Sequence, residues 1–163
     1  MINTLPSQNL TMLGNLLGRK ILSVKRQLFK DDRDLGGFEE NADGPVEFIV
    51  DDNSVFHLIA ETEVFSVGVV SGQMPLYGSS YKQVDVSNDS FWKVRIGQTI
   101  NQLTIYKASD WSEDYPSEFG VEIMFENGKK ALIEYVGNEE NLDMVRVVEG
   151  YEGLPCITKS MEL

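Results

Sequence analysis

Two stretches of alternating apolar and polar residues constrain the fold more than any other feature of the chain. The first runs from Gly44 to Glu61 (GPVEFIVDDNSVFHLIAE) and the second from Phe119 to Gly137 (FGVEIMFENGKKALIEYVG). Alternation with a period of two is typical of half-buried β-strands, and the polar turn in the middle of each stretch joins two such strands into a hairpin. The sequence therefore predicts two β-hairpins.

The length of each turn decides which side chains share a face. A two-residue Asn127-Gly128 turn would mix charged side chains into the apolar face. A three-residue turn with Gly128 in the left-handed conformation keeps that face apolar throughout. The same turn in the first hairpin gives the left-handed position to Asn53, which Asn tolerates. The predicted apolar faces are Val46, Phe48, Val50, Phe56, Leu58 and Ala60 in the first hairpin, and Val121, Ile123, Phe125, Ala131, Ile133 and Tyr135 in the second.

The hairpins belong to a longer order of elements that occurs twice. Residues 7–72 and 88–150 each predict a short helix, a strand, an acidic linker, a hairpin and a further strand. Ser7 is expected to cap a helix that Gly18 ends. The strand that follows is expected to place Leu22, Val24 and Leu28 on one face. Few residues are identical between the halves, so a duplicated unit and a chance agreement of β patterning both remain open.

These patterns predict an α+β, mainly β fold. The length of 163 residues suits one domain with a full hydrophobic core. We therefore expect a single compact domain over residues 1–163, built from two pseudo-equivalent halves in a sandwich-like or barrel-like arrangement.

The strongly acidic composition narrows the classes of partner. The formal net charge is −12, which disfavours nucleic acid and anionic membrane surfaces because both attract clustered Lys and Arg. The sequence contains neither a membrane-spanning apolar run nor a signal peptide, and its one cysteine, Cys156, rules out an internal disulfide. These features predict a cytoplasmic protein.

The residues that support catalysis in known enzyme classes are scarce. The sequence has no phosphate-binding loop, no dinucleotide fingerprint and no hydrolase motif, so we expect no catalytic residue, metal or cofactor and lean toward a non-enzyme. The predicted register puts Glu47 directly across from His57, the only histidine. This pair is either an acid/base pair in a pocket or an ordinary cross-strand polar pair. The second hairpin has Glu122 and Leu132 at the corresponding positions.

The two acidic linkers are the predicted site of function. The linkers, residues 30–45 and 107–118, together account for seven of the twelve net negative charges. Both carry large apolar side chains among the acids, a combination that suits contact with a basic protein. The candidate partner-binding residues are Asp31, Asp32, Asp34, Phe38, Glu39 and Glu40 in the first linker, and Asp110, Trp111, Glu113, Asp114 and Tyr115 in the second.

Three functions are consistent with these features. The first is a non-enzymatic module that binds another protein, with a basic protein as one candidate, as a bacterial immunity or inhibitor protein does. The second is a small-molecule-binding module or enzyme with a cleft between the halves, in which Glu47 and His57 line a pocket. The third is a component of a homo-oligomer formed through exposed strand edges. The sequence does not predict the oligomeric state.

Overall fold

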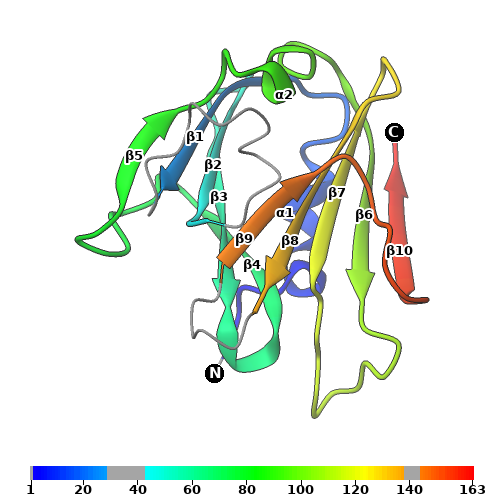
Figure 1. The fold of residues 1–163 in the computed structure, drawn as a ribbon. Coiled ribbons are helices and arrows are strands. Elements are labelled where there is room, and N and C mark those ends of the chain that lie inside the picture. The colour runs from blue at the N-terminus through cyan, green and yellow to red at the C-terminus, as the bar shows by residue number, and fades with distance from the viewer. Residues whose placement is uncertain (1, 29–42, 138–143) are drawn as a thin grey trace.

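The computed structural model describes residues 2–28, 43–137 and 144–163, and these ranges form two antiparallel sheets of five strands each (Figure 1). The first sheet has the order β4-β3-β2-β1-β5 and the second the order β10-β6-β7-β8-β9. The first sheet contains β1 (Ile21–Leu28), β2 (Val46–Val50), β3 (Val55–Glu61), β4 (Ser66–Ser71) and β5 (Lys82–Asp85). The second contains β6 (Ile100–Lys107), β7 (Gly120–Phe125), β8 (Lys130–Val136), β9 (Met144–Val148) and β10 (Ile157–Glu162).

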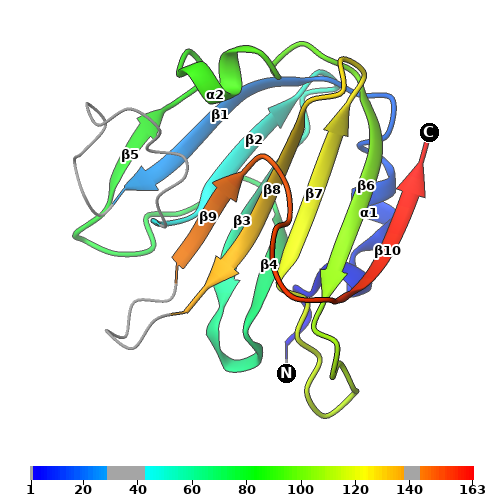
Figure 2. The same ribbon diagram turned by 45° about the vertical axis from the view of Figure 1, so that its right-hand side comes forward.

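The two sheets repeat one topology, which confirms the prediction of two pseudo-equivalent halves. In each half, four strands that are consecutive in the chain pair in turn, and a fifth strand returns to the free side of the first (Figure 2). The halves meet where β1 and β6 begin, at an antiparallel bridge between Lys20 and Thr99. Reciprocal hydrogen bonds flank the bridge, from Gly18 N to Ile100 O at 2.8 Å and from Gly97 N to Ile21 O at 3.0 Å. This reciprocity is the local signature of a pseudo-twofold axis.

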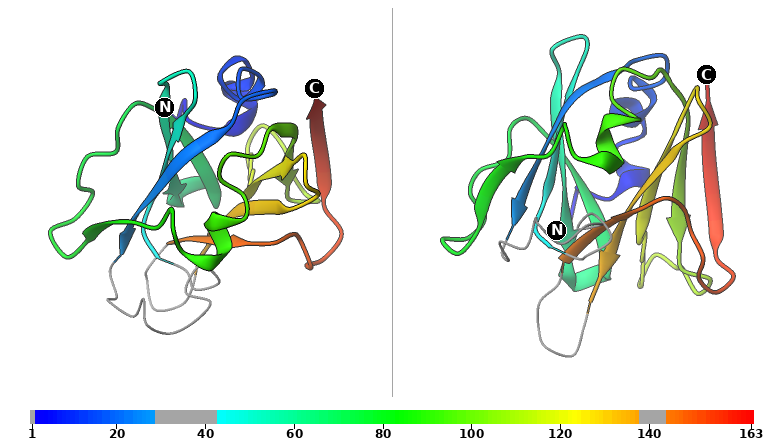
Figure 3. Two further views of the ribbon diagram at one scale, coloured as in Figure 1. Left: turned by 90° about the horizontal axis from the view of Figure 1, so that it is seen from above. Right: turned by 45° about the horizontal axis from the view of Figure 1, so that its top comes forward.

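The helices are short and lie on opposite sides of the molecule (Figure 3). A 3-10 turn (Pro6–Gln8) and α1 (Leu10–Gly14) precede the first sheet, and α2 (Ser90–Lys93) precedes the second. The predicted helix from Ser7 to Gly18 is therefore too long. Ser7 does not cap it, because the Ser7 hydroxyl donates to the Glu118 carboxylate at 2.5 Å.

Both hairpin turns have the predicted length. Phe125 N donates to Lys129 O at 2.9 Å, and Gly128 has a φ of 83°. In the first hairpin Val50 N donates to Ser54 O at 3.0 Å, and Asn53 has a φ of 67°. The alternation of side chains along each strand then fixes the inner faces, as predicted.

The inner faces of both sheets form one hydrophobic core, in a sandwich-like arrangement. Leu13 of α1 and Trp92 of α2 are buried in this core from the two sides. Leu22 does not share the face of Val24 and Leu28, contrary to the prediction, because the β1–β2 register shifts between Ile21 and Ser23 and leaves Leu22 exposed. The β6–β7 register shifts at the equivalent point, between residues 100 and 102.

A backbone segment of each half also forms hydrogen bonds with an edge strand of the other half's sheet. Val67 N of β4 donates to Glu118 O at 3.0 Å, and Val145 N of β9 donates to Asp43 O at 2.8 Å. Glu118 and Asp43 lie just before the hairpins of the opposite halves, so the halves interlock as one compact domain. The edge strands β5 and β10 were not predicted, because their exposed, polar sequences lack an apolar face.

Candidate functional site

The acidic linker of the second half is folded into a small, closed loop between β6 and β7. Ser112 N donates to Tyr115 O at 3.2 Å and Tyr115 N donates to Ser112 O at 3.1 Å, so Glu113 and Asp114 form the tip of a two-residue turn. Ala108 N donates to Ser117 O at 3.0 Å and closes the base. The loop therefore presents its tip from a fixed backbone.

The base of this loop is attached to the first half of the domain. The buried Glu118 carboxylate accepts hydrogen bonds from the Ser7 backbone N–H at 2.7 Å and from the Ser7 hydroxyl. Glu118 N donates to the Ser66 hydroxyl at 2.8 Å, and the Ser117 hydroxyl donates to Phe65 O at 2.9 Å. These contacts place the loop beside the turn between β3 and β4, at one end of the molecule (Figures 1 and 2).

The two neighbouring segments create a surface that we call the acidic end surface, defined as Glu63, Phe65, Asp110, Glu113, Asp114 and Tyr115. All six side chains are exposed. Tyr115 is 75% exposed and Phe65 is 62% exposed. Phe65 also has a φ of 49°, a left-handed conformation that is unfavourable for an aromatic residue, and its ring packs edge-on against Tyr135.

Trp111 differs from its neighbours in the loop. Its ring lies 4.6 Å from Lys107 Nζ, and its indole Nε1 is buried without a hydrogen-bond partner among the described residues. Trp111 is therefore partly buried support for the loop, whereas Tyr115 is the aromatic side chain that the loop presents. Of the predicted partner-binding residues, the structure brings Asp110, Glu113, Asp114 and Tyr115 onto one surface, while Asp31, Asp32, Asp34, Phe38, Glu39 and Glu40 lie outside the described residues.

Glu47 and His57 face each other in the predicted register, but each bonds to a different group. The connection between β4 and β5 crosses the outer face of the first sheet, where Glu47 accepts a hydrogen bond from Met74 N at 2.8 Å. His57, which is 1% exposed, lies 2.8 Å from Gly72 O through Nδ1 and 2.7 Å from the Tyr77 hydroxyl through Nε2. The pair therefore holds this connection against the sheet.

A small pocket lies between the halves, next to this network. Its volume is about 200 Å³. Tyr77 and Tyr81 line the pocket, and burial raises the pKa of both side chains, with a smaller contribution from nearby acidic groups. His57 does not line this pocket. Tyr77 does line it, and the centroids of the Tyr77 and His57 rings are 5.7 Å apart. The lining residues are Asp43, Gly44, Pro45, Ile59, Ala60, Tyr77, Tyr81, Met144 and Val145.

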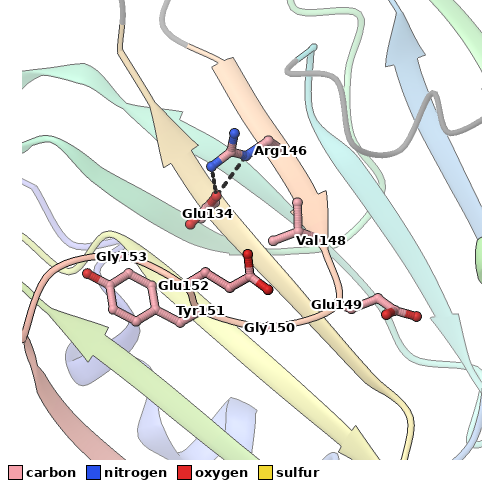
Figure 4. Close-up of a pocket in the computed structure, with 8 residues that line it drawn as sticks. All are labelled: Glu134, Arg146, Val148, Glu149, Gly150, Tyr151, Glu152 and Gly153. Atoms are coloured by element: carbon pink, nitrogen blue, oxygen red, sulfur yellow. Dashed lines mark hydrogen bonds and ion pairs between the residues drawn. The ribbon is translucent and has the colours of Figure 1, made fainter.

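A larger cleft, of about 570 Å³, lies on the outer face of the second sheet (Figure 4). Its floor is formed by β8 and β9, and its wall by the start of the connection between β9 and β10. Arg146 Nε donates to Glu134 Oε1 at 2.7 Å, and Arg146 Nη2 contacts the same oxygen. The lining residues are Glu134, Arg146, Val148, Glu149, Gly150, Tyr151, Glu152 and Gly153.

Aromatic rings connect this cleft with the acidic loop. Tyr151 packs on Tyr106 and Phe119, with ring centroids 5.2 and 5.4 Å apart. Tyr106 donates its hydroxyl to Glu122 Oε2 at 3.0 Å. Phe119 directly follows the acidic loop in the chain, so the rings form a continuous surface from the loop to the cleft wall. No pattern in the sequence predicted this cleft, because it depends on where the connection after β9 crosses the sheet.

Within residues 2–28, 43–137 and 144–163, no group of three or more His, Cys, Asp or Glu side chains is arranged to hold a metal ion. None of the helices in these ranges has the length and apolar character needed to cross a membrane.

Comparisons with known proteins do not assign a family. No protein-family model, curated protein or solved structure matches this chain. The function of the chain therefore has to be inferred from the geometry of the site alone.

Proposed function

We propose that this protein is a non-enzymatic module that binds a basic protein through the acidic end surface. The observation that carries the proposal is the presentation of Tyr115, an exposed aromatic side chain beside Glu113 and Asp114 on a loop closed by hydrogen bonds at both ends. Exposed tyrosines are common binding hot spots, and a loop that is rigid before binding loses less conformational entropy when the partner docks.

The charge of the acidic end surface indicates the chemistry of the partner. Four of its six residues are acidic and none is basic. Such a surface attracts positively charged proteins and disfavours acidic ones, and the attraction weakens as salt screens it. A bacterial immunity or inhibitor protein is the most specific version of this proposal, because masking a basic effector requires a complementary surface and no chemistry of its own.

A matched pair of variants tests this proposal. Glu113→Gln/Tyr115→Ala removes one charge and one exposed ring from the acidic end surface. Glu162→Gln/Leu76→Ala removes one charge and one exposed apolar side chain elsewhere. Tagged wild type and both variants are recovered from the native cells, and the proteins bound to each are quantified by mass spectrometry.

We expect a basic protein to bind wild type and the control equally. Loss of a hot spot is worth 2 kcal/mol or more, so the loop variant should bind it roughly 30-fold more weakly. Equal recovery by the loop variant would contradict the proposal. Recovery of wild type with further copies of itself, checked by sedimentation, would favour the homo-oligomer instead.

The pocket between the halves supports a second candidate, a small-molecule-binding module. Tyr77 and Tyr81 contribute hydroxyl groups beside the apolar Ile59 and Met144, a mixture typical of ligand sites. Its volume of about 200 Å³ is below the usual range of about 300–1,000 Å³, so we rank this candidate second. Stabilisation of wild type by a metabolite in thermal-shift screens, lost in Tyr81→Ala, would favour it over protein binding.

A further inference from the structure

We infer that the cleft on the outer face of the second sheet receives one basic side chain, an arginine or a lysine, from a protein partner. The inference extends the proposed function, because it adds a second contact for the same kind of partner at a place that the acidic end surface does not include. It depends on the cleft's shape, on an unused carboxylate oxygen and on the charge of the lining.

The carboxylate of Glu134 has one oxygen that the protein does not use. Glu134 is 7% exposed, and both contacts from Arg146 go to its Oε1. Arginine commonly binds a carboxylate with two parallel hydrogen bonds, one to each oxygen, but here Oε2 has no hydrogen-bond or ion-pair partner among the described residues. Oε2 is not among the fully buried side-chain atoms of the described residues that lack a hydrogen-bond partner, so a ligand in the cleft can reach it, and a cationic N–H that donated to it would form a charge-assisted hydrogen bond.

The other charges of the lining favour a cation over an anion. Glu149 is already paired with Arg95, whose Nη2 lies 3.0 Å from it. Glu152 is exposed and has no hydrogen-bond or ion-pair partner in the part of the chain that the structure describes. The cleft therefore contains one excess carboxylate and one unused carboxylate oxygen, and an anionic ligand would be repelled by both.

The shape of the cleft suits a long basic side chain. A volume of about 570 Å³ lies within the usual range for ligand sites. Val148 and Tyr151 give the lining an apolar portion that could pack against the methylene groups of arginine or lysine. The packing of Tyr151 against Tyr106 and Phe119 makes the cleft wall continuous with the acidic loop, so one partner could contact both.

The test uses short peptides, so it does not require the native partner. The probes are acetyl-Gly-Arg-Gly-amide, its lysine counterpart, and a neutral control with citrulline, which keeps the shape of arginine without its charge. Binding to the full chain is followed through the backbone amide signals of residues 146–153 in nitrogen-15 NMR spectra. We expect the arginine and lysine peptides to shift these signals at millimolar concentration and the citrulline peptide to leave them in place.

Three variants locate the charge that matters. Glu152→Gln should weaken binding of the arginine peptide about two- to five-fold, the range for one exposed ion pair, whereas the control Glu162→Gln should not change it. Glu134→Gln/Arg146→Gln removes the ion pair as a unit, which avoids leaving one buried charge alone, and should remove most of the remaining affinity. Thermal unfolding of each variant checks that the fold is intact.

The outcomes separate this inference from the proposed function. Equal shifts with the citrulline peptide, no shifts with either basic peptide, or shifts that Glu152→Gln and Glu134→Gln/Arg146→Gln leave unchanged would each overturn it. Shifts caused equally by spermidine would assign the cleft to small free cations and would also overturn it. Glu113→Gln/Tyr115→Ala should bind the peptides as wild type does, so loss of partner binding in that variant tests the proposed function alone.

Discussion

The connections that follow β4 and β9 occupy equivalent places in the two halves but contact their sheets in different ways. In the first half, the chain after β4 bonds to buried polar side chains of the outer face: Gln27 Nε2 donates to Pro75 O at 2.6 Å, and Glu47 and His57 bind Met74 and Gly72. In the second half the equivalent positions carry Tyr106, Glu122 and Leu132. Tyr106 and Glu122 bond to each other, and Leu132 offers no polar atom.

The second connection is therefore held by aromatic packing, and a cleft remains beside it. Tyr151 contacts Tyr106 and Phe119, and the space over Glu134 and Arg146 stays open. Two halves with one strand order therefore differ in their outer-face contacts through a few positions, and only the second half has this cleft over Glu134 and Arg146. The inner faces, which must fill a shared core, have much less freedom to differ.

The largest predicted effect concerns the helices that anchor each half. Leu13 and Trp92 are equivalent core residues, five positions before Gly18 and Gly97, and both are fully buried. Trp92 also contacts the Phe48 ring at 5.5 Å between centroids. Trp92→Ala should lower the free energy of unfolding by about 3–5 kcal/mol and Leu13→Ala by about 2–5 kcal/mol. Urea titration measures both, and a loss below about 1 kcal/mol in either variant would contradict the tight packing of that side chain in the shared core.

The second prediction transfers one residue between the halves. His57→Leu places in the first half the residue type that the second half has at the equivalent position, Leu132. The substitution leaves Gly72 O and the Tyr77 hydroxyl without the imidazole that they contact. Loss of these bonds should cost about 1–3 kcal/mol in urea unfolding. The reciprocal Leu132→His buries an imidazole where the second half offers no matching partner and should also destabilise. Neutral results for both would mean that the two connections are interchangeable.

The third prediction concerns alkaline pH. Burial, followed by the charge of Glu122 and their hydrogen bond, raises the pKa of Tyr106 above its ordinary value of 10. A raised pKa in the folded state means that Tyr106 contributes stability below pH 10, and that this contribution is lost as pH rises through the folded pKa. Tyr106→Phe should therefore lose less stability than wild type between pH 9 and pH 12 in thermal unfolding. Parallel pH profiles would contradict this assignment.

The smallest predicted effect concerns the two hairpin turns. Asn53 and Gly128 occupy equivalent left-handed positions, but only glycine adopts this conformation without steric cost. Asn53→Gly should change the free energy of unfolding by less than about 1 kcal/mol in either direction, because relief of strain opposes a larger entropy loss. Gly128→Val should destabilise by more than 1 kcal/mol, since a β-branched residue is strained there. Equal, small effects at both sites would show that the turns tolerate strain alike.

The sequence predicted the elements whose side chains alternate strongly. One rule predicted the hairpin turns at Asn53 and Gly128, the inner faces and the Glu47–His57 register. A shift of the strand pairing by one residue would expose the whole set of apolar side chains. Within the candidate site, the sequence indicated the acids and Tyr115 of the second linker but gave no sign that Phe65 lies beside them. That contact depends on the bond from Ser117 to Phe65 O, which joins segments far apart in the chain.

The hairpin faces, the repeated order of elements and the acidic residues of the second linker could be predicted because each depends on the local spacing of residues. Which outer-face side chains are buried depends instead on tertiary contacts. His57 is enclosed and Glu134 lines a cleft because the chain after β4 and after β9 crosses the two sheets with different contacts. The edge strands β5 and β10 and the interlocking pairs at Glu118 and Asp43 also appear only when distant backbone groups meet, since a backbone hydrogen bond leaves no pattern in side-chain chemistry.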